Sequence, residues 1–259
     1  MGAVRIVGES GPVVLLLPGG AEPADGFFPG QVDGLAQSCR VVLHDRPGTG
    51  RSTVDGALAG ATAHLHALVG ELGEPVVAVG QSLGGAVAVL LAREHPADLA
   101  GVVLLDPSPI NDPASARRLE RTSAAVSALA RFGPTRRPVR AAFRAAARRE
   151  LRGLRGLRPD CAAAFARTLD TDLPQLGRAV AGFAGLAAGL READLPRLPS
   201  AVVTADRPAG TAMRRAHARL AEAFGGPLVS WPGATHSVHL DHPDEVLDTI
   251  RAVVGEAGR

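Results

Sequence analysis

Short apolar runs rich in β-branched residues recur along the chain and alternate with segments of helical character. Several runs are apolar at every position, which is typical of strands buried on both faces of a parallel sheet. This alternation predicts an α/β, doubly wound, mostly parallel fold, with functional groups beyond the carboxyl ends of the strands. The predicted strands are Val4–Val7, Val13–Leu17, Val41–Leu43, Val76–Val79, Val102–Leu105, Ala201–Thr204 and Leu228–Trp231, and the predicted helices are Gly30–Gln37, Ala57–Leu72, Leu83–Glu94, Met213–Phe224 and Pro243–Val254.

Residues 107–199 interrupt this alternation. They contain no strand pattern, only helical sequence rich in alanine, leucine and arginine and cut by prolines at positions 134, 138, 159, 174 and 196. The chain is therefore expected to have a core domain in two parts, residues 1–106 and 200–259, with a helical cap inserted as residues 107–199.

The middle of the insertion is strongly basic. Between Arg131 and Arg158 there are ten arginines and one acidic residue, Glu150. Their spacing predicts a helix with an arginine face and an opposing apolar stripe. A solvated face covering a core is the favoured interpretation, and a site for an acidic substrate group or an acidic partner is the alternative. The face comprises Arg137, Arg140, Arg144, Arg148, Arg152 and Arg155, and the stripe comprises Phe143, Ala147, Leu151 and Leu154.

One serine has the local sequence of a nucleophile. Ser82 lies in Gly80-Gln81-Ser82-Leu83-Gly84, directly between a predicted strand and a predicted helix. A serine flanked by glycines in that context forms a nucleophile elbow, a tight turn that lifts the hydroxyl above the sheet. The helix that follows aims its free N–H groups at the same place, where they can receive a developing oxyanion. The alternative is a glycine-rich turn whose serine only caps the helix.

Composition excludes several classes of protein. The formal net charge of +2 gives no general case for nucleic-acid binding. Two cysteines, Cys39 and Cys161, form neither a disulfide framework nor a metal motif, which favours a reducing cytosol. No signal peptide is visible at the N-terminus, and the apolar run Val13–Leu17 is too short to span a membrane. We therefore expect a cytoplasmic protein with no nucleic-acid or membrane partner.

Four motifs occur in an order that resembles the α/β-hydrolase fold superfamily. Leu15–Gly20 ends a strand in a glycine turn, Asp45–Ser52 follows the next strand, Gly80–Gly85 is the elbow, and Pro232–Pro243 lies near the C-terminus. The resemblance covers essentially the whole chain except the insertion, which would match the variable cap of that family. It departs from the family at Pro18, where a histidine is common.

The resemblance implies a role for each of several residues. Ser82 would be the nucleophile and His236 its general base, ahead of the neighbouring His239, which is predicted to lie in an extended segment. Backbone amides of Gly20 and Leu83 would form the oxyanion hole. No recognisable zinc motif accompanies the histidines, so no metal is expected.

The acid that should orient the histidine has two candidates. Asp206 follows the penultimate strand, the commonest place in this superfamily, but about two residues early, with Pro208 at the expected position. Asp106 ends the strand after the elbow, where some members carry the acid, and is favoured. Asp45 and Arg46 are interpreted as braces of the loop that follows them.

The function implied is that of a cofactor-independent serine hydrolase with a small-molecule acyl substrate. An ester, thioester or lactone would be cleaved through an acyl-enzyme. An acyl transferase, a C–C hydrolase or a perhydrolase would use the same groups, and a non-catalytic ligand-binding or scaffolding protein could keep the fold. Ser82 argues against dehalogenases and epoxide hydrolases of this fold, which use a carboxylate nucleophile.

Overall fold

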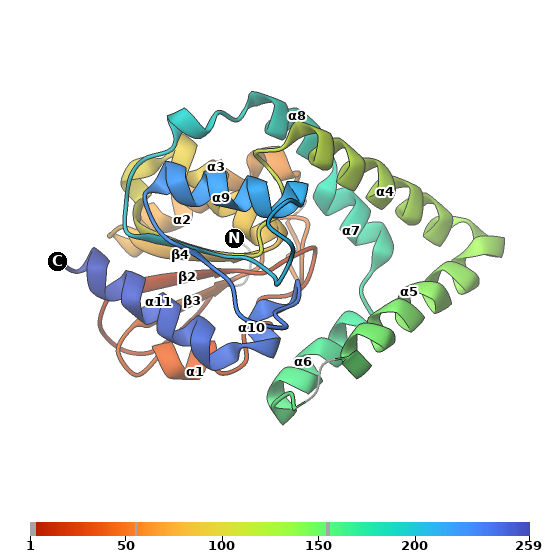
Figure 1. Ribbon diagram of the computed structural model, residues 1–259, viewed down its shortest axis with the longest axis horizontal. Coiled ribbons are helices and arrows are strands. Elements are labelled where there is room, and N and C mark those ends of the chain that lie inside the picture. Colours follow the sequence, from red (N-terminus) through yellow and green to blue (C-terminus); the bar gives the residue numbers. More distant parts are fainter. Residues whose placement is uncertain (1–3, 55, 154–155) are drawn as a thin grey trace.

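The computed structural model describes residues 4–54, 56–153 and 156–259, which form a seven-stranded sheet flanked by helices (Figure 1). The strand order is β1-β3-β2-β4-β5-β6-β7, and every neighbouring pair is parallel except β1 with β3. The predicted doubly wound α/β fold is confirmed. The strands are β1 (Val4–Val7), β2 (Val13–Leu17), β3 (Arg40–His44), β4 (Val76–Gln81), β5 (Leu99–Leu105), β6 (Ser200–Val203) and β7 (Leu228–Val229).

Helices cover both faces of this sheet (Figure 1). Because successive side chains of a strand point to opposite faces, Leu15 packs into the core cluster on the side of α2, α3 and α9, and Leu16 into the cluster on the side of α1 and α11. Burial on both faces explains why the central strands are apolar at every position. These helices are α1 (Gln31–Leu35), α2 (Ala61–Leu72), α3 (Leu83–Glu94), α9 (Ala212–Phe224), α10 (Val238–Asp241) and α11 (Pro243–Ala257), with 3₁₀ turns η1 (Leu58–Gly60) and η2 (Pro96–Asp98).

Several predicted bounds differ from the structure, and β5, for example, begins at Leu99 rather than at Val102. Three further local differences follow from the neighbouring structure. The helix predicted from Ala57 begins at Ala61, because η1 precedes it. Strand β7 ends at Val229, because Trp231 already opens a turn in which its carbonyl accepts a bond from the amide of residue 234. The extended segment predicted around His239 is wrong, because that residue lies in the short helix α10.

Between β5 and β6 the described residues contain helices and no strand. Figure 1 shows α4 running outward from the core and α5 returning to α6, while α7 and α8 lie beside α4. Pro138 lies inside α5, so the prediction that it interrupts the helix is wrong. Its missing N–H removes one hydrogen bond near the start of a long helix. The helices of this cap segment (residues 107–199) are α4 (Pro113–Arg131), α5 (Gly133–Gly153), α6 (Pro159–Thr168), α7 (Leu173–Val180) and α8 (Phe183–Gly189), with the 3₁₀ turn η3 (Glu192–Asp194).

Helix α5 carries the predicted arginine face. Arg144 and Arg148 are exposed, whereas Ala147 and Leu151 pack against the small apolar cluster that contains Phe165. Of the other residues predicted for this helix, Leu154, Arg155 and the side chain of Arg152 lie outside the described part of the chain. Throughout the described ranges, no helix combines the length and apolarity that crossing a bilayer requires.

Candidate active site

Ser82 occupies a tight turn between the end of β4 and the start of α3. Its backbone angles are φ 51° and ψ −115°, and a positive φ is uncommon outside glycine. A Cβ on Gly80 would lie 2.5 Å from the Gly84 carbonyl oxygen, and one on Gly84 would lie 2.1 Å from the Leu17 carbonyl oxygen. Both positions therefore require glycine, and the turn holds the hydroxyl at the carboxyl edge of the sheet.

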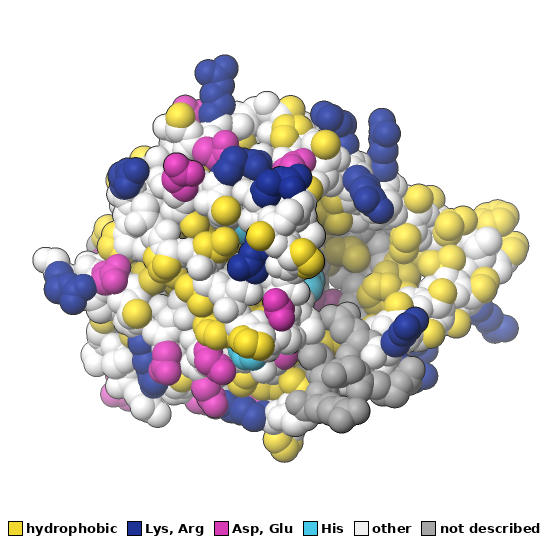
Figure 2. All heavy atoms as spheres, in the orientation of Figure 1, with side chains coloured by type: hydrophobic (Ala, Val, Ile, Leu, Met, Phe, Trp, Pro, Cys, Tyr) yellow, Lys and Arg dark blue, Asp and Glu magenta, His cyan; other side chains and the backbone are white. Residues whose placement is uncertain are grey.

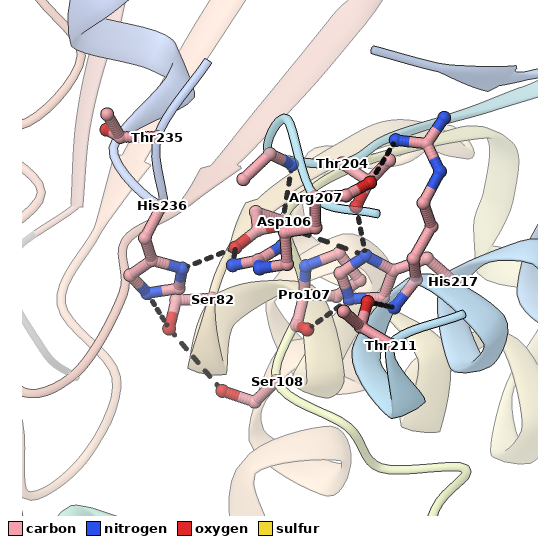
Figure 3. Close-up of polar contacts among 12 residues, drawn as sticks. Ser82, Asp106, Pro107, Ser108, Thr204, Arg207, Thr211, His217, Thr235 and His236 are labelled. Carbon is pink, nitrogen blue, oxygen red and sulfur yellow. Dashed lines mark hydrogen bonds and ion pairs between the residues drawn. The ribbon is translucent and has the colours of Figure 1, made fainter. Parts of the chain in front are cut away.

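The His236 ring lies against this hydroxyl. Nε2 of His236 is 2.9 Å from Ser82 Oγ, although 154 positions separate the two residues in sequence (Figure 3). The side-chain amide of Gln81 donates to the His236 carbonyl at 2.8 Å and so ties the histidine loop to the elbow. The hydroxyl of Ser108 lies 3.4 Å from that of Ser82.

Of the two candidate acids, Asp106 is the one beside His236. Its Oδ2 is 2.6 Å from His236 Nδ1, so Nδ1–H donates to the carboxylate and leaves Nε2 to accept from Ser82 (Figure 3). Asp106 is buried and has a positive φ of 43°. Asp206 is exposed, and its carboxylate accepts instead from the amide of Gly233 at 3.0 Å. The structure thus joins Ser82, His236 and Asp106 in one hydrogen-bonded chain.

Asp106 has a second side-chain partner that no sequence motif predicts. Arg207, in the loop after β6, donates from Nη1 to Oδ1 and from Nη2 to Oδ2, the latter at 2.6 Å. The amide of Ala205 also donates to Oδ1, at 2.9 Å. Burial raises the pKa of Asp106, but hydrogen bonds from Arg207 and His236 outweigh it and hold the pKa well below the usual range. The carboxylate therefore stays ionised at neutral pH.

A buried histidine packs behind the same carboxylate. Nε2 of His217 lies 2.9 Å from the carbonyl of Pro107, to which it donates, and Nδ1 lies 2.8 Å from the hydroxyl of Thr204 (Figure 3). Burial lowers the pKa of His217 and favours the neutral ring, although Asp106 Oδ1 is only 3.7 Å from Nδ1. With Thr204 donating to Nδ1, both ring nitrogens of neutral His217 are satisfied.

The two predicted oxyanion donors line the same pocket as Ser82. Gly20 follows β2 with φ 55°, and Leu83 is the first residue of α3. Within the described chain, neither amide donates a hydrogen bond to another residue. Both are thus available to a ligand oxygen above the elbow.

Asp45 and Arg46 brace two loops. The Asp45 carboxylate accepts from the amides of Ala24, at 2.6 Å, and Arg51, at 2.8 Å. Arg46 is buried and donates from Nη2 to the Gly20 carbonyl at 3.1 Å, which supports the loop where Pro18 stands in place of the common histidine. Burial lowers the pKa of Arg46 to about 10, so the guanidinium stays charged.

The pocket above Ser82 has a volume of about 430 Å³, within the range of small-molecule sites. Its floor includes the elbow and His236, and its walls come from α4, α5, α6 and α7 of the cap segment. The rival His239 also lines it, but its ring stacks on Phe27 with centroids 4.7 Å apart. Burial lowers the pKa of His239 to about 3.

Comparison with known proteins assigns the family. A sequence model described as the alpha/beta hydrolase family matches residues 14–249, most of the chain. The chain belongs to the alpha/beta hydrolase family. The resemblance inferred from the four motifs is confirmed.

Solved structures of the same fold include enzymes of several names. A thermophilic esterase from Thermogutta terrifontis is 22% identical, with 99% of this chain and 94% of that chain covered and a TM-score of 0.74. A putative epoxide hydrolase from Pseudomonas aeruginosa is 25% identical, with 99% and 93% covered and a TM-score of 0.74. MenH from S. aureus is 15% identical, with all of both chains covered and a TM-score of 0.77. The family supports a hydrolase, and these neighbours share its fold.

Two further residues of this alpha/beta hydrolase carried a weak signal or none in the sequence. Arg207 stands between Asp206 and Pro208 in the loop where an acid is expected, and its charge is the one local signal of a partner for Asp106. Glu22 lines the pocket two residues beyond Gly20, and nothing in its local sequence indicates that position.

Proposed function

We propose that this alpha/beta hydrolase is a serine hydrolase that cleaves an ester, thioester or lactone through an acyl-enzyme. The observation that carries the proposal is the unbroken contact from Ser82 Oγ to His236 Nε2 at 2.9 Å and from His236 Nδ1 to Asp106 Oδ2 at 2.6 Å. A serine needs a base because its free hydroxyl is almost wholly protonated near neutral pH.

Acylation follows from this geometry. Ser82 Oγ attacks the carbonyl carbon of a small-molecule acyl substrate, and its proton passes to His236 Nε2. The carbonyl oxygen becomes an oxyanion that accepts hydrogen bonds from the amides of Gly20 and Leu83. When the bond to the leaving group breaks, the imidazolium returns the proton to the departing alcohol or thiol, and the acyl group stays on Ser82.

Deacylation repeats these steps with water as the nucleophile. His236 takes a proton from the water, which attacks the acyl carbon, and the same amides receive the second oxyanion. Ser82 Oγ then leaves and regains its proton from His236, releasing the carboxylic acid. Asp106 remains ionised throughout and stabilises the imidazolium. Every proton in this cycle is carried by the substrate, water or a side chain, so no cofactor or metal enters a step.

A fluorophosphonate probe together with para-nitrophenyl esters tests the proposal. We expect the probe to label Ser82 and Ser82→Ala to lose both labelling and about a thousandfold or more of kcat. Ser108→Ala removes the hydroxyl beside Ser82 and serves as the matched control, which should still be labelled. A folded wild-type protein without labelling would support a non-catalytic binding protein instead. Labelling without ester hydrolysis would favour the acyl transferase, C–C hydrolase or perhydrolase alternatives.

A further inference from the structure

The wall of the pocket facing Ser82 is built from apolar side chains of the cap segment. Leu119 comes from α4, Phe143 from α5, Phe165 from α6, and Leu176 and Val180 from α7. Figure 2 shows hydrophobic side chains along the cap where it faces the core. A ligand portion that fills this space gains free energy in proportion to the apolar surface it buries.

The many arginines of the cap do not contribute to this wall. Among the described residues, no arginine lines the pocket. Arg144 pairs with Asp170, and Arg158 pairs at 2.8 Å with Asp244 of α11, and all four side chains are exposed to solvent. Arg167 donates to the backbone carbonyl of residue 26. An anionic group in the pocket would therefore meet no cationic side chain in the lining.

The lining instead contains the carboxylate of Glu22, which lies beside the loop that carries the Gly20 amide. The amide of Glu22 donates to the Gly19 carbonyl at 3.2 Å, and its carboxylate accepts from the Thr171 hydroxyl at 2.6 Å. Burial raises the pKa of Glu22, although Thr171 and the nearby Arg167 partly oppose this. His239, the buried histidine of the lining, is held neutral by its low pKa and supplies no positive charge.

We propose that the pocket binds an uncharged, apolar acyl group and that Glu22 excludes acyl groups carrying a carboxylate. This inference rests on the proposed ester hydrolysis and adds its substrate class. A second negative charge in this partly desolvated space is repelled by Glu22 more strongly than it would be in water. Such a group would also lose its own hydration without gaining a hydrogen-bonded cation in exchange.

Three para-nitrophenyl esters of equal reactivity at the carbonyl test this inference. Para-nitrophenyl hexanoate ends in a methyl group, the mono-para-nitrophenyl ester of adipic acid ends in a carboxylate, and the methyl ester of the latter is polar but neutral. At pH 8 and low salt, kcat/KM for the carboxylate ester is expected to be at least about tenfold below that of its neutral methyl ester. Added salt should narrow the difference, because screening weakens charge repulsion.

Substitution of Glu22 identifies the source of the discrimination. We compare kcat/KM for the neutral methyl ester with kcat/KM for the carboxylate ester. Glu22→Gln is expected to reduce this ratio by about tenfold, whereas Glu22→Asp should keep most of the discrimination. Glu71→Gln makes the same change on the exposed surface of α2, outside the pocket, and should leave the ratio at the wild-type value.

The outcomes separate this inference from the function on which it rests. If no ester is hydrolysed and Ser82 is not labelled by a fluorophosphonate, the proposed function fails. If the neutral esters are hydrolysed but the carboxylate ester is hydrolysed equally well, the charge exclusion is wrong. An unchanged ratio in Glu22→Gln would also overturn the assignment to Glu22.

Discussion

Replacing Arg207 by glutamine is expected to move the acidic limb of the pH–activity profile to higher pH. Arg207 Nη2 and His236 Nδ1 each lie 2.6 Å from Oδ2 of Asp106, so these nitrogens are no more than about 5.2 Å apart. When His236 is protonated, the Asp106 carboxylate is shared between two cations. Without the guanidinium, the positive charge of Arg207 no longer repels the His236 imidazolium, which is therefore more stable. A more alkaline solution is then needed to deprotonate His236 so that it can act as the base.

The size of the shift follows from that separation. Two unit charges about 5 Å apart interact by about 3 kcal/mol at an effective dielectric constant of about 20. The His236 side chain is 49% exposed, so solvent screening reduces the effect to about half. Since one pH unit corresponds to about 1.4 kcal/mol, the limb should move upward by about one unit. The carboxylate also loses two of its four donors, which should lower the plateau of kcat/KM by about tenfold.

The assay is kcat/KM for a neutral para-nitrophenyl ester across the pH range, with two companion variants. Arg207→Lys keeps the charge but not the bidentate geometry, so its plateau should fall while its acidic limb stays near that of the wild type. Arg215→Gln removes a guanidinium that, among the described residues, donates only to the Gly210 carbonyl, and this variant should match the wild type in both respects. If Arg207→Gln lowers the plateau but leaves the limb in place, Arg207 is only a structural support and the electrostatic argument is refuted.

Two further predictions concern the same site and use the same esters. Asp106→Asn should lower kcat by about a thousandfold or more, because the amide cannot stabilise the imidazolium and disfavours the productive tautomer of His236. The kcat of the control variant Asp206→Asn should stay within a few-fold of the wild-type value. Equal losses of kcat in the two variants would contradict the assignment of Asp106 as the acid. Arg46→Met should lower kcat by about tenfold with little change in KM, because the Gly20 carbonyl loses its buried donor and the loop that carries the Gly20 amide is less firmly held. An unaltered kcat in a variant with an intact thermal transition would show that this loop needs no support from Arg46.

The sheet and the elbow were predictable because their signals are local. Continuous apolar runs follow from burial on both faces, so β2 appears with its predicted bounds, Val13–Leu17. The glycines around Ser82 are required by backbone approaches of 2.1 to 2.5 Å, and such a requirement is visible in sequence as a fixed spacing. The helix predicted at Leu83–Glu94 likewise forms with its predicted bounds, since it begins at the elbow itself.

The choice of acid could not be settled in the same way. Asp106 and Asp206 both follow strands that are neighbours in the sheet, so strand-end reasoning brings both to the same edge. What separates them is the direction of each side chain. Asp106 turns toward His236 from a backbone with φ 43°, while Asp206 lies three positions beyond the end of β6 and turns to Gly233. These contacts join residues far apart in sequence, and no local pattern encodes them.

Arg207 escaped prediction for a related reason, and its position shapes the chemistry of the site. The loop after β6, where the family commonly carries its acid, here supplies a cation to a carboxylate that directly follows β5. With Ala205 and His236, Arg207 provides four hydrogen bonds to the two oxygens of Asp106, and this set holds the carboxylate in one orientation. A carboxylate so held keeps the proton of His236 on Nδ1 and leaves Nε2 facing Ser82. Because the same donors disfavour protonation of Asp106, the proposed mechanism moves the catalytic proton only between Ser82, His236 and the substrate or water.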